Sequence, residues 1–69
     1  SPTRKQRSLE ARESLILDHA HDLLSEKGYL GFNLDELAGR IEYAKGTIYL
    51  HFATKEDVVL GVVVRLAQE

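Results

Sequence analysis

Apolar residues recur at helical spacing from Leu9 to Lys27, with polar residues between them. This pattern predicts a first helix whose buried face carries Ile16, Ala20, Leu23 and Leu24. Gly28 follows Lys27, and a basic residue before a glycine is typical of a helix C-terminus. The segment 28–32 contains a second glycine, which indicates a short connection. We expect Phe32, at its end, to fill the core at the entry to the next helix.

Two short helices are predicted in the middle of the chain. The first has one apolar face, made of Leu34, Leu37, Ala38 and Ile41. Asn33 precedes it as a favourable N-cap, and Glu36 can complete a reciprocal cap. Residues 42–44 form a tight connection to the second short helix. Ile48 and Phe52 mark the inward face of that helix, because residues four positions apart lie on the same side.

A fourth helix is predicted over residues 54–69. Thr54 and Asp57 have the spacing of a capping box at its start. The many valines that follow also favour a strand, but the cap and the helical neighbours favour a helix. This helix is apolar on almost every side, which is typical of a helix that is buried on every side. We expect one face to pack on the first three helices and the other to face a domain outside this chain. The alternative is an apolar C-terminal helix in a small bundle.

The segment from Leu34 to Tyr49 has the spacing of a helix-turn-helix, in which two short helices cross closely. Ala38 supplies the small residue that a close crossing requires. The apolar contacts that would fix the crossing angle come from Leu37, Ile41 and Ile48. The second helix then projects its N-terminal half outward, where it can enter a major groove of DNA. The sequence therefore predicts an all-α fold, a small helical bundle with a three-helix DNA-binding unit at 9–53 and a linking helix at 54–69.

The outward residues of the predicted recognition helix are Lys45, Gly46, Thr47 and Tyr49. Lys45 can bond a guanine edge or a phosphate. Thr47 can bond a phosphate or touch a thymine methyl group, and Tyr49 can reach a sugar or a phosphate. Gly46 costs about 1 kcal/mol of helix propensity relative to alanine, which indicates that a ligand approaches the backbone there. These residue types predict contacts with both bases and phosphates.

Charge along the 69-residue chain is uneven, and the net charge of −2 hides this. A negative net charge argues against a nucleic-acid partner, but the distribution of charge along the chain matters more. Residues 1–8 are basic and lack apolar periodicity, so we expect a disordered arm that contacts the minor groove or phosphates through Arg4, Lys5 and Arg7. The middle of the chain is acidic, and residues 40–55 are basic again. His51 and Lys55 should lie where the DNA backbone passes, beside the N-terminus of the fourth helix.

The stretch KGTIYLHF followed by ATKEDVV resembles the signature of the TetR repressor family. NLDELA is similar to the second helix of that family, and the resemblance extends from Arg12 to Leu60. It implies that DNA is contacted by Lys45, Thr47, Tyr49, His51 and Lys55, and that Asn33 replaces the usual threonine at a phosphate-contacting cap. Two positions depart from the family pattern. Glu42 stands where the turn commonly has glycine, and Ala44 stands where serine or threonine caps the recognition helix. We count Ala44 and Gly46 among the candidate DNA-binding residues.

The resemblance also implies a biological setting. The chain would be the N-terminal DNA-binding domain of a one-component regulator, a repressor that binds a near-palindromic operator on double-stranded DNA. Two copies would be joined as a homodimer by a C-terminal domain outside this chain. A small-molecule inducer bound in that other domain would release the DNA. No cofactor is implied for the DNA-binding domain.

Other functions have weaker support in the residues. His19 and His21 point in different directions on a helix and no cysteine accompanies them, so we expect no metal site. The acidic pairs of the chain fit a solvated helix face, and so small a domain leaves little room for a catalytic cleft, so we expect no enzyme. Neither a membrane span nor a signal peptide is evident, which favours the cytoplasm. The alternative function is a small protein-interaction module that docks through its apolar last helix.

Overall fold

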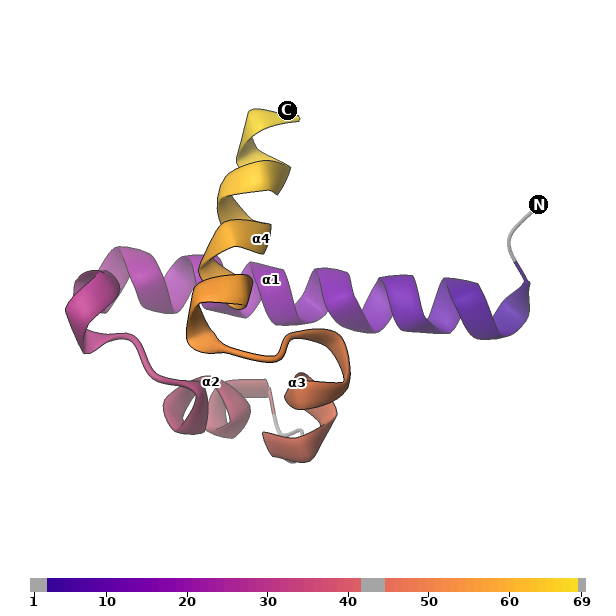
Figure 1. Ribbon diagram of the computed structural model, residues 1–69, viewed down its shortest axis with the longest axis horizontal. Coiled ribbons are helices and arrows are strands. Elements are labelled where there is room, and N and C mark those ends of the chain that lie inside the picture. The colour runs from indigo at the N-terminus through magenta and orange to yellow at the C-terminus, as the bar shows by residue number, and fades with distance from the viewer. Residues whose placement is uncertain (1–2, 42–44, 69) are drawn as a thin grey trace.

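The computed structural model describes residues 3–41 and 45–68, with the backbone alone at Lys45. Helices are the regular elements of these ranges: α1 (Arg4–Gly31), α2 (Leu34–Ile41), α3 (Lys45–His51) and α4 (Lys55–Ala67). Helix α1 is the long axis of the molecule, and α2 and α3 lie together on one side of it (Figure 1). Helix α4 crosses α1 steeply, and its C-terminal end points away from α2 and α3. The all-α helical bundle is therefore confirmed.

Helix α1 begins earlier than the sequence analysis predicted. The hydroxyl of Thr3 accepts a hydrogen bond from the backbone N–H of Gln6 at 3.2 Å and caps the helix. Residues 4–8, expected to be part of a disordered arm, are helical. Arginine, lysine and glutamine are favourable helix formers, so this polar segment extends the helix without contributing to the core. The expectation relied on apolar periodicity and missed the cap at Thr3.

The predicted stop after Lys27 is confirmed by the backbone of Gly28. Its φ of 73° and ψ of 173° interrupt the helical path within the range assigned to α1. A side chain at this position would be strained, because L-residues rarely adopt a positive φ. The following turn is closed by the backbone N–H of Phe32, which donates to the carbonyl of Tyr29 at 3.3 Å. Phe32 is buried in the core, as predicted.

Both predicted N-caps are confirmed. The amide oxygen of Asn33 accepts from the backbone N–H of Glu36 at 2.8 Å, and the hydroxyl of Thr54 accepts from that of Asp57 at 3.2 Å. The carboxylate of Glu36 does not serve as the predicted reciprocal cap in this arrangement. It lies instead 3.5 Å from Nζ of Lys27 on α1 and 3.7 Å from Nη2 of Arg40, one turn later on α2. Each cap satisfies a backbone donor that the first turn of a helix leaves free.

One apolar core joins all four helices. Helix α1 contributes its predicted face, and α3 contributes Ile48, with Phe52 directly after it. Among the described residues, the buried set of this core is Ile16, Leu17, Ala20, Leu23, Phe32, Leu34, Leu37, Ala38, Ile41, Ile48, Phe52, Val58 and Val62. The inward placement of Ile48 and Phe52 and the helical form of the fourth element are both confirmed.

Helix α4 packs on α1 along one side only. Gly61 lies at the closest approach, where a Cβ atom would meet Leu17 Cδ2 at 3.0 Å and Phe52 Cε1 at 3.2 Å. Nearer the C-terminus, Nη2 of Arg65 lies 2.9 Å from a carboxylate oxygen of Asp18 on α1. Outside this contact, α4 exposes Leu60, Val63, Val64 and Leu66. Within residues 3–41 and 45–68, no helix combines the length and the apolar character that crossing a bilayer requires.

Candidate nucleic-acid interface

Helices α2 and α3 form the predicted helix-turn-helix arrangement, with α2 also packed on α1. Leu37 and Ile48 are fully buried between the elements, and Ala38 and Ile41 are buried beside them. The small side chain of Ala38 permits the close crossing. The turn itself, with Glu42 and the candidate cap residue Ala44, lies outside the described residues. With Ile48 pointing inward, the opposite side of α3 faces solvent.

The solvent-facing side of α3 carries three of the predicted site residues. Tyr49 is 46% exposed, Thr47 is half-buried, and Gly46 is exposed. A Cβ atom at Gly46 would meet nothing within 4 Å, so packing inside the chain does not require glycine there. Lys45 is the first residue of α3. The geometry that the DNA-binding interpretation depends on, with Tyr49 outward and Ile48 inward on a helix, is therefore present.

Leu50 is a surface residue of α3 that the sequence analysis did not single out. Its side chain is 78% exposed beside Tyr49 and takes no part in the core. The signal was available, because a helix that turns Ile48 and Phe52 inward must turn the residue midway between them outward. Leu50 adds an apolar group to a surface that was expected to be polar apart from Tyr49. An apolar side chain on a recognition helix can contact a thymine methyl group.

His51 lies differently from the expectation. Its side chain is only 5% exposed, and Nδ1 lies 3.3 Å from a carboxylate oxygen of Glu13 on α1. Its Nε2 is buried and has no hydrogen-bond partner among the residues that the structure describes. Position 51 is one turn beyond Ile48, so it shares the inward side of α3 and meets α1. In this arrangement His51 attaches α3 to α1 and offers little surface to a DNA phosphate.

Two predicted site residues lie at helix starts on the edge of the helix-turn-helix. Lys55 is the first residue of α4, and Asn33 directly precedes α2. The ammonium group of Lys55 lies 4.2 Å from the ring centroid of Tyr29, which belongs to the turn after Gly28. The hydroxyl of Tyr29 donates to a carboxylate oxygen of Glu56 at 3.1 Å, and this bond raises the pKa of Tyr29. The exposed Asn33 uses its amide oxygen for the cap, so its amide N–H groups remain the donors for a ligand.

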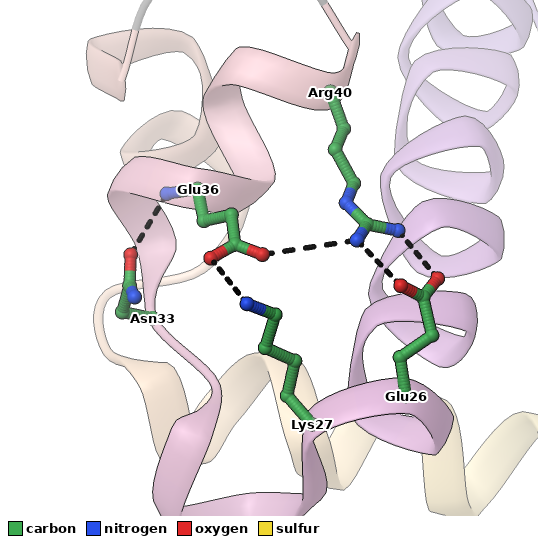
Figure 2. Close-up of polar contacts among 5 residues, drawn as sticks. All are labelled: Glu26, Lys27, Asn33, Glu36 and Arg40. Atoms are coloured by element: carbon green, nitrogen blue, oxygen red, sulfur yellow. Dashed lines mark hydrogen bonds and ion pairs between the residues drawn. The ribbon is translucent and has the colours of Figure 1, made fainter.

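Four charged residues fasten α2 to the end of α1, as Figure 2 shows. The guanidinium of Arg40 binds both carboxylate oxygens of Glu26, at 2.7 and 2.8 Å, and its Nη2 lies 3.7 Å from Glu36. Lys27 approaches the other oxygen of Glu36 at 3.5 Å. Hydrogen bonding to Arg40 holds the pKa of Glu26 below its usual range. Arg40 was counted in the basic segment 40–55, but its charge is directed to these carboxylates.

The basic residues near the N-terminus lie on an exposed part of α1. Arg4, Lys5 and Arg7 belong to its first two turns, and all three are exposed. This end of α1 extends beyond the other helices (Figure 1). Arg4, Lys5 and Arg7 are thus presented by a helix, whereas the sequence predicted a disordered arm. Elsewhere on α1, His19 and His21 are both half-buried, and no group of three or more potential metal ligands comes together within the described ranges.

Comparison with known proteins agrees with this geometry. A family model described as "Bacterial regulatory proteins, tetR family" matches residues 16–62, which include α2, α3 and most of α4. The biofilm operon icaADBC HTH-type negative transcriptional regulator IcaR of Staphylococcus aureus (strain Newman) is 42% identical over 43 residues, 62% of this chain and 23% of that protein. The regulator of the same name from Staphylococcus epidermidis is 40% identical over 43 residues, with the same coverage.

The chain spans about a quarter of the length of these relatives. No solved structure matches it at a comparable level of significance. The family match covers the whole helix-turn-helix and the packed faces of α1 and α4, the parts that hold α3 outward. The chain belongs to the tetR family of bacterial regulatory proteins.

Proposed function

We propose that this chain binds double-stranded DNA by placing α3 in a major groove, as the DNA-binding domain of a transcriptional repressor. The observation that carries the proposal is the division of α3 into a buried side at Ile48 and an exposed side at Tyr49. A recognition helix needs such a division, because its position must be fixed by the core while its outer side chains reach base edges. The relatives named above are described as negative transcriptional regulators, which supports repression.

Distinct groups would contact bases and backbone. Lys45, Thr47 and Tyr49 would reach the groove from α3, and Gly46 would let the DNA approach the helix backbone closely. Asn33 and Lys55 would bond phosphates from the starts of α2 and α4, where the positive ends of the helix dipoles also favour an anion. Ala44 would contribute through its backbone at the start of the recognition helix. Arg4, Lys5 and Arg7 would add phosphate or minor-groove contacts from the end of α1.

His51 has a narrower role in this proposal than the family resemblance implied. Its ring is nearly buried and already engaged by Glu13. It would act on DNA binding by keeping α3 against α1 rather than by touching a phosphate. The base and phosphate contacts of α3 would then depend on the side chains that face solvent.

The complete regulator would bind as a homodimer. Residues 9–53 would read one half-site, and residues 54–69 would connect to a C-terminal dimerisation and ligand-binding domain. Two recognition helices about one DNA turn apart would fit a near-palindromic operator. The exposed apolar side of α4 supports this arrangement, because it gives the other domain a surface to pack on. A small molecule bound in that domain would release the DNA. Such a regulator works in the cytoplasm and has no catalytic role.

The proposal is tested by binding a fluorescent DNA duplex, selected from a randomised pool, at several salt concentrations. With three or four phosphates neutralised per protomer, log affinity should fall against log salt with a slope of about −3. Tyr49→Ala is the variant to compare with the unchanged chain, because it alters the exposed side of α3 and leaves the core intact. It should bind the duplex more weakly. Binding that is absent, or that does not weaken with salt, would contradict the proposal.

One observation favours a second candidate function. The exposed residues Leu60, Val63, Val64 and Leu66 of α4 would also suit a helical protein-interaction module. The same salt titration separates the two functions, since a module of that kind would need no salt-dependent DNA affinity. DNA binding that survives a Leu60→Ser/Val64→Ser variant would assign the apolar surface to another domain rather than to DNA.

A further inference from the structure

We propose that Tyr29 is a positioning residue for DNA binding, because its ring holds the ammonium group of Lys55 ready for a phosphate. The inference rests on the function proposed above, in which Lys55 contacts the DNA backbone. Tyr29 is 44% exposed and lies in the turn that follows Gly28, far from α4 in sequence. It is nevertheless the residue that meets both Lys55 and Glu56 at the start of α4.

The contact to Lys55 is a cation–π pair. The Nζ atom lies 4.2 Å from the ring centroid, within the distance at which the ring face attracts a cation. An ammonium group has three N–H donors, and a ring face engages only one side of it. The donors on the other side remain available to a phosphate oxygen. The ring therefore restrains Lys55 without consuming its capacity to bind DNA.

The hydroxyl of Tyr29 holds the neighbouring acidic residue. It donates to Oε1 of Glu56 at 3.1 Å. Glu56 follows Lys55 directly, and a carboxylate that reached the ammonium group would compete with a phosphate for it. Tyr29 thus contacts the cation with its ring and the anion with its hydroxyl, and keeps the two charges on separate parts of one side chain.

Backbone features fix both sides of this contact before any DNA is bound. Gly28 directs the chain out of the helical path immediately before Tyr29, and Phe32 anchors the end of the turn in the core. On the other side, the Thr54 cap sets the first turn of α4 and so the origin of the Lys55 side chain. A long lysine side chain loses much rotamer freedom when it is immobilised on binding. Restraining it in the free protein reduces that loss.

The test is a double-mutant cycle on the 69-residue chain with the selected DNA duplex. Lys55→Gln removes the cation, Tyr29→Leu removes the ring, and Tyr29→Phe keeps the ring but loses the hydroxyl. We expect Tyr29→Leu to weaken DNA binding about two- to fivefold, the range of an exposed cation–π pair. Tyr29→Phe, which releases Glu56 but keeps the ring against Lys55, should lose less than Tyr29→Leu. In the Lys55→Gln background, Tyr29→Leu should cause no further loss. Thermal unfolding of each variant checks that the domain remains folded.

The salt dependence gives a readout that a purely structural role would not move. Lys55→Gln should make the slope of log affinity against log salt shallower by about 0.9, the value of one phosphate contact. Tyr29→Leu should shift it in the same direction, and by more than Tyr29→Phe does. Equal losses in the two Tyr29 variants, or an undiminished effect of Tyr29→Leu when Lys55 is absent, would overturn the inference. If the unchanged chain itself does not bind the duplex, the proposed function fails and this inference fails with it.

Discussion

Nδ1 of His51 on α3 lies 3.3 Å from Oε2 of Glu13 on α1, and this pair attaches the recognition helix directly to the longest helix of the domain. The side chain of His51 is only 5% exposed, while that of Glu13 is half exposed. A histidine in the motif that resembles the TetR signature therefore points into the protein here. Its position separates two kinds of residue on α3, those that hold the helix and those that can touch a ligand.

His51→Ala is expected to lower the stability of the free domain. The change removes a nearly buried ring and its contact with Glu13, so we expect the free energy of unfolding to fall by about 1–3 kcal/mol. Denaturant unfolding without DNA measures this effect. A residue that served only to contact phosphate would leave the unfolding midpoint unchanged, and that result would contradict the role assigned to His51.

Tyr49 and Phe52 provide a matched pair with opposite expected effects. Tyr49→Ala should weaken DNA binding while the free energy of unfolding stays within about 0.5 kcal/mol, because the ring is half exposed. Phe52→Ala should cost about 3–5 kcal/mol of stability, because it opens a cavity in the core. Chemical denaturation and duplex titration of both variants measure the two effects. If Tyr49→Ala unfolds and Phe52→Ala folds normally, the assigned sides of α3 are reversed.

Gly46 is expected to favour DNA binding at a cost in the stability of the domain. Its φ is not in the left-handed region and space for a Cβ is open, so Gly46→Ala should raise the free energy of unfolding by roughly 0.5–1 kcal/mol. The added methyl group would lie where DNA should approach, so affinity for the duplex should fall. Gly39→Ala is the control, because Gly39 in α2 also has open space. Equal DNA affinity in both variants would count against a close approach at Gly46.

The Glu26–Arg40 contact predicts a loss of stability in acid. Hydrogen bonding to Arg40 lowers the folded-state pKa of Glu26 below its unfolded value. The stabilisation is therefore present at pH values above the unfolded pKa and disappears as pH falls through the folded pKa. Glu26→Gln should lower the melting temperature near neutral pH, and the difference from the unchanged chain should shrink in acid. Parallel melting curves over the whole acid range would contradict this assignment.

Much of the fold follows from local patterns in the sequence. The caps at Asn33 and Thr54 and the stop at Gly28 were predictable, because each depends on a residue and its nearest neighbours. The start of α1 was missed, since residues 4–8 bury nothing and show no periodicity. Helix propensity and the hydroxyl of Thr3 determine that start.

The candidate interface was harder to predict in full. The outward position of Tyr49 follows from helical periodicity once Ile48 is placed inside. The engagement of His51 by Glu13 joins residues far apart in the chain, and periodicity carries no information about such a partner. The same holds for Tyr29 and Lys55, whose contact depends on how the end of α1 meets the start of α4. Charge counts failed at Arg40 for the same reason, because its carboxylate partners include Glu26 on another helix.

The absence of a Cβ atom at Gly61 lets α4 pack directly against residues of α1 and of the segment that ends α3. The backbone of α4 there is close enough to Leu17 and Phe52 that even one added carbon would crowd both. Phe52 is the residue immediately after α3, so no intervening loop absorbs a displacement at this junction. A tilt of α4 toward α1 would therefore press on Phe52 at the end of α3, and it would change the direction in which the exposed side chains of α3 point.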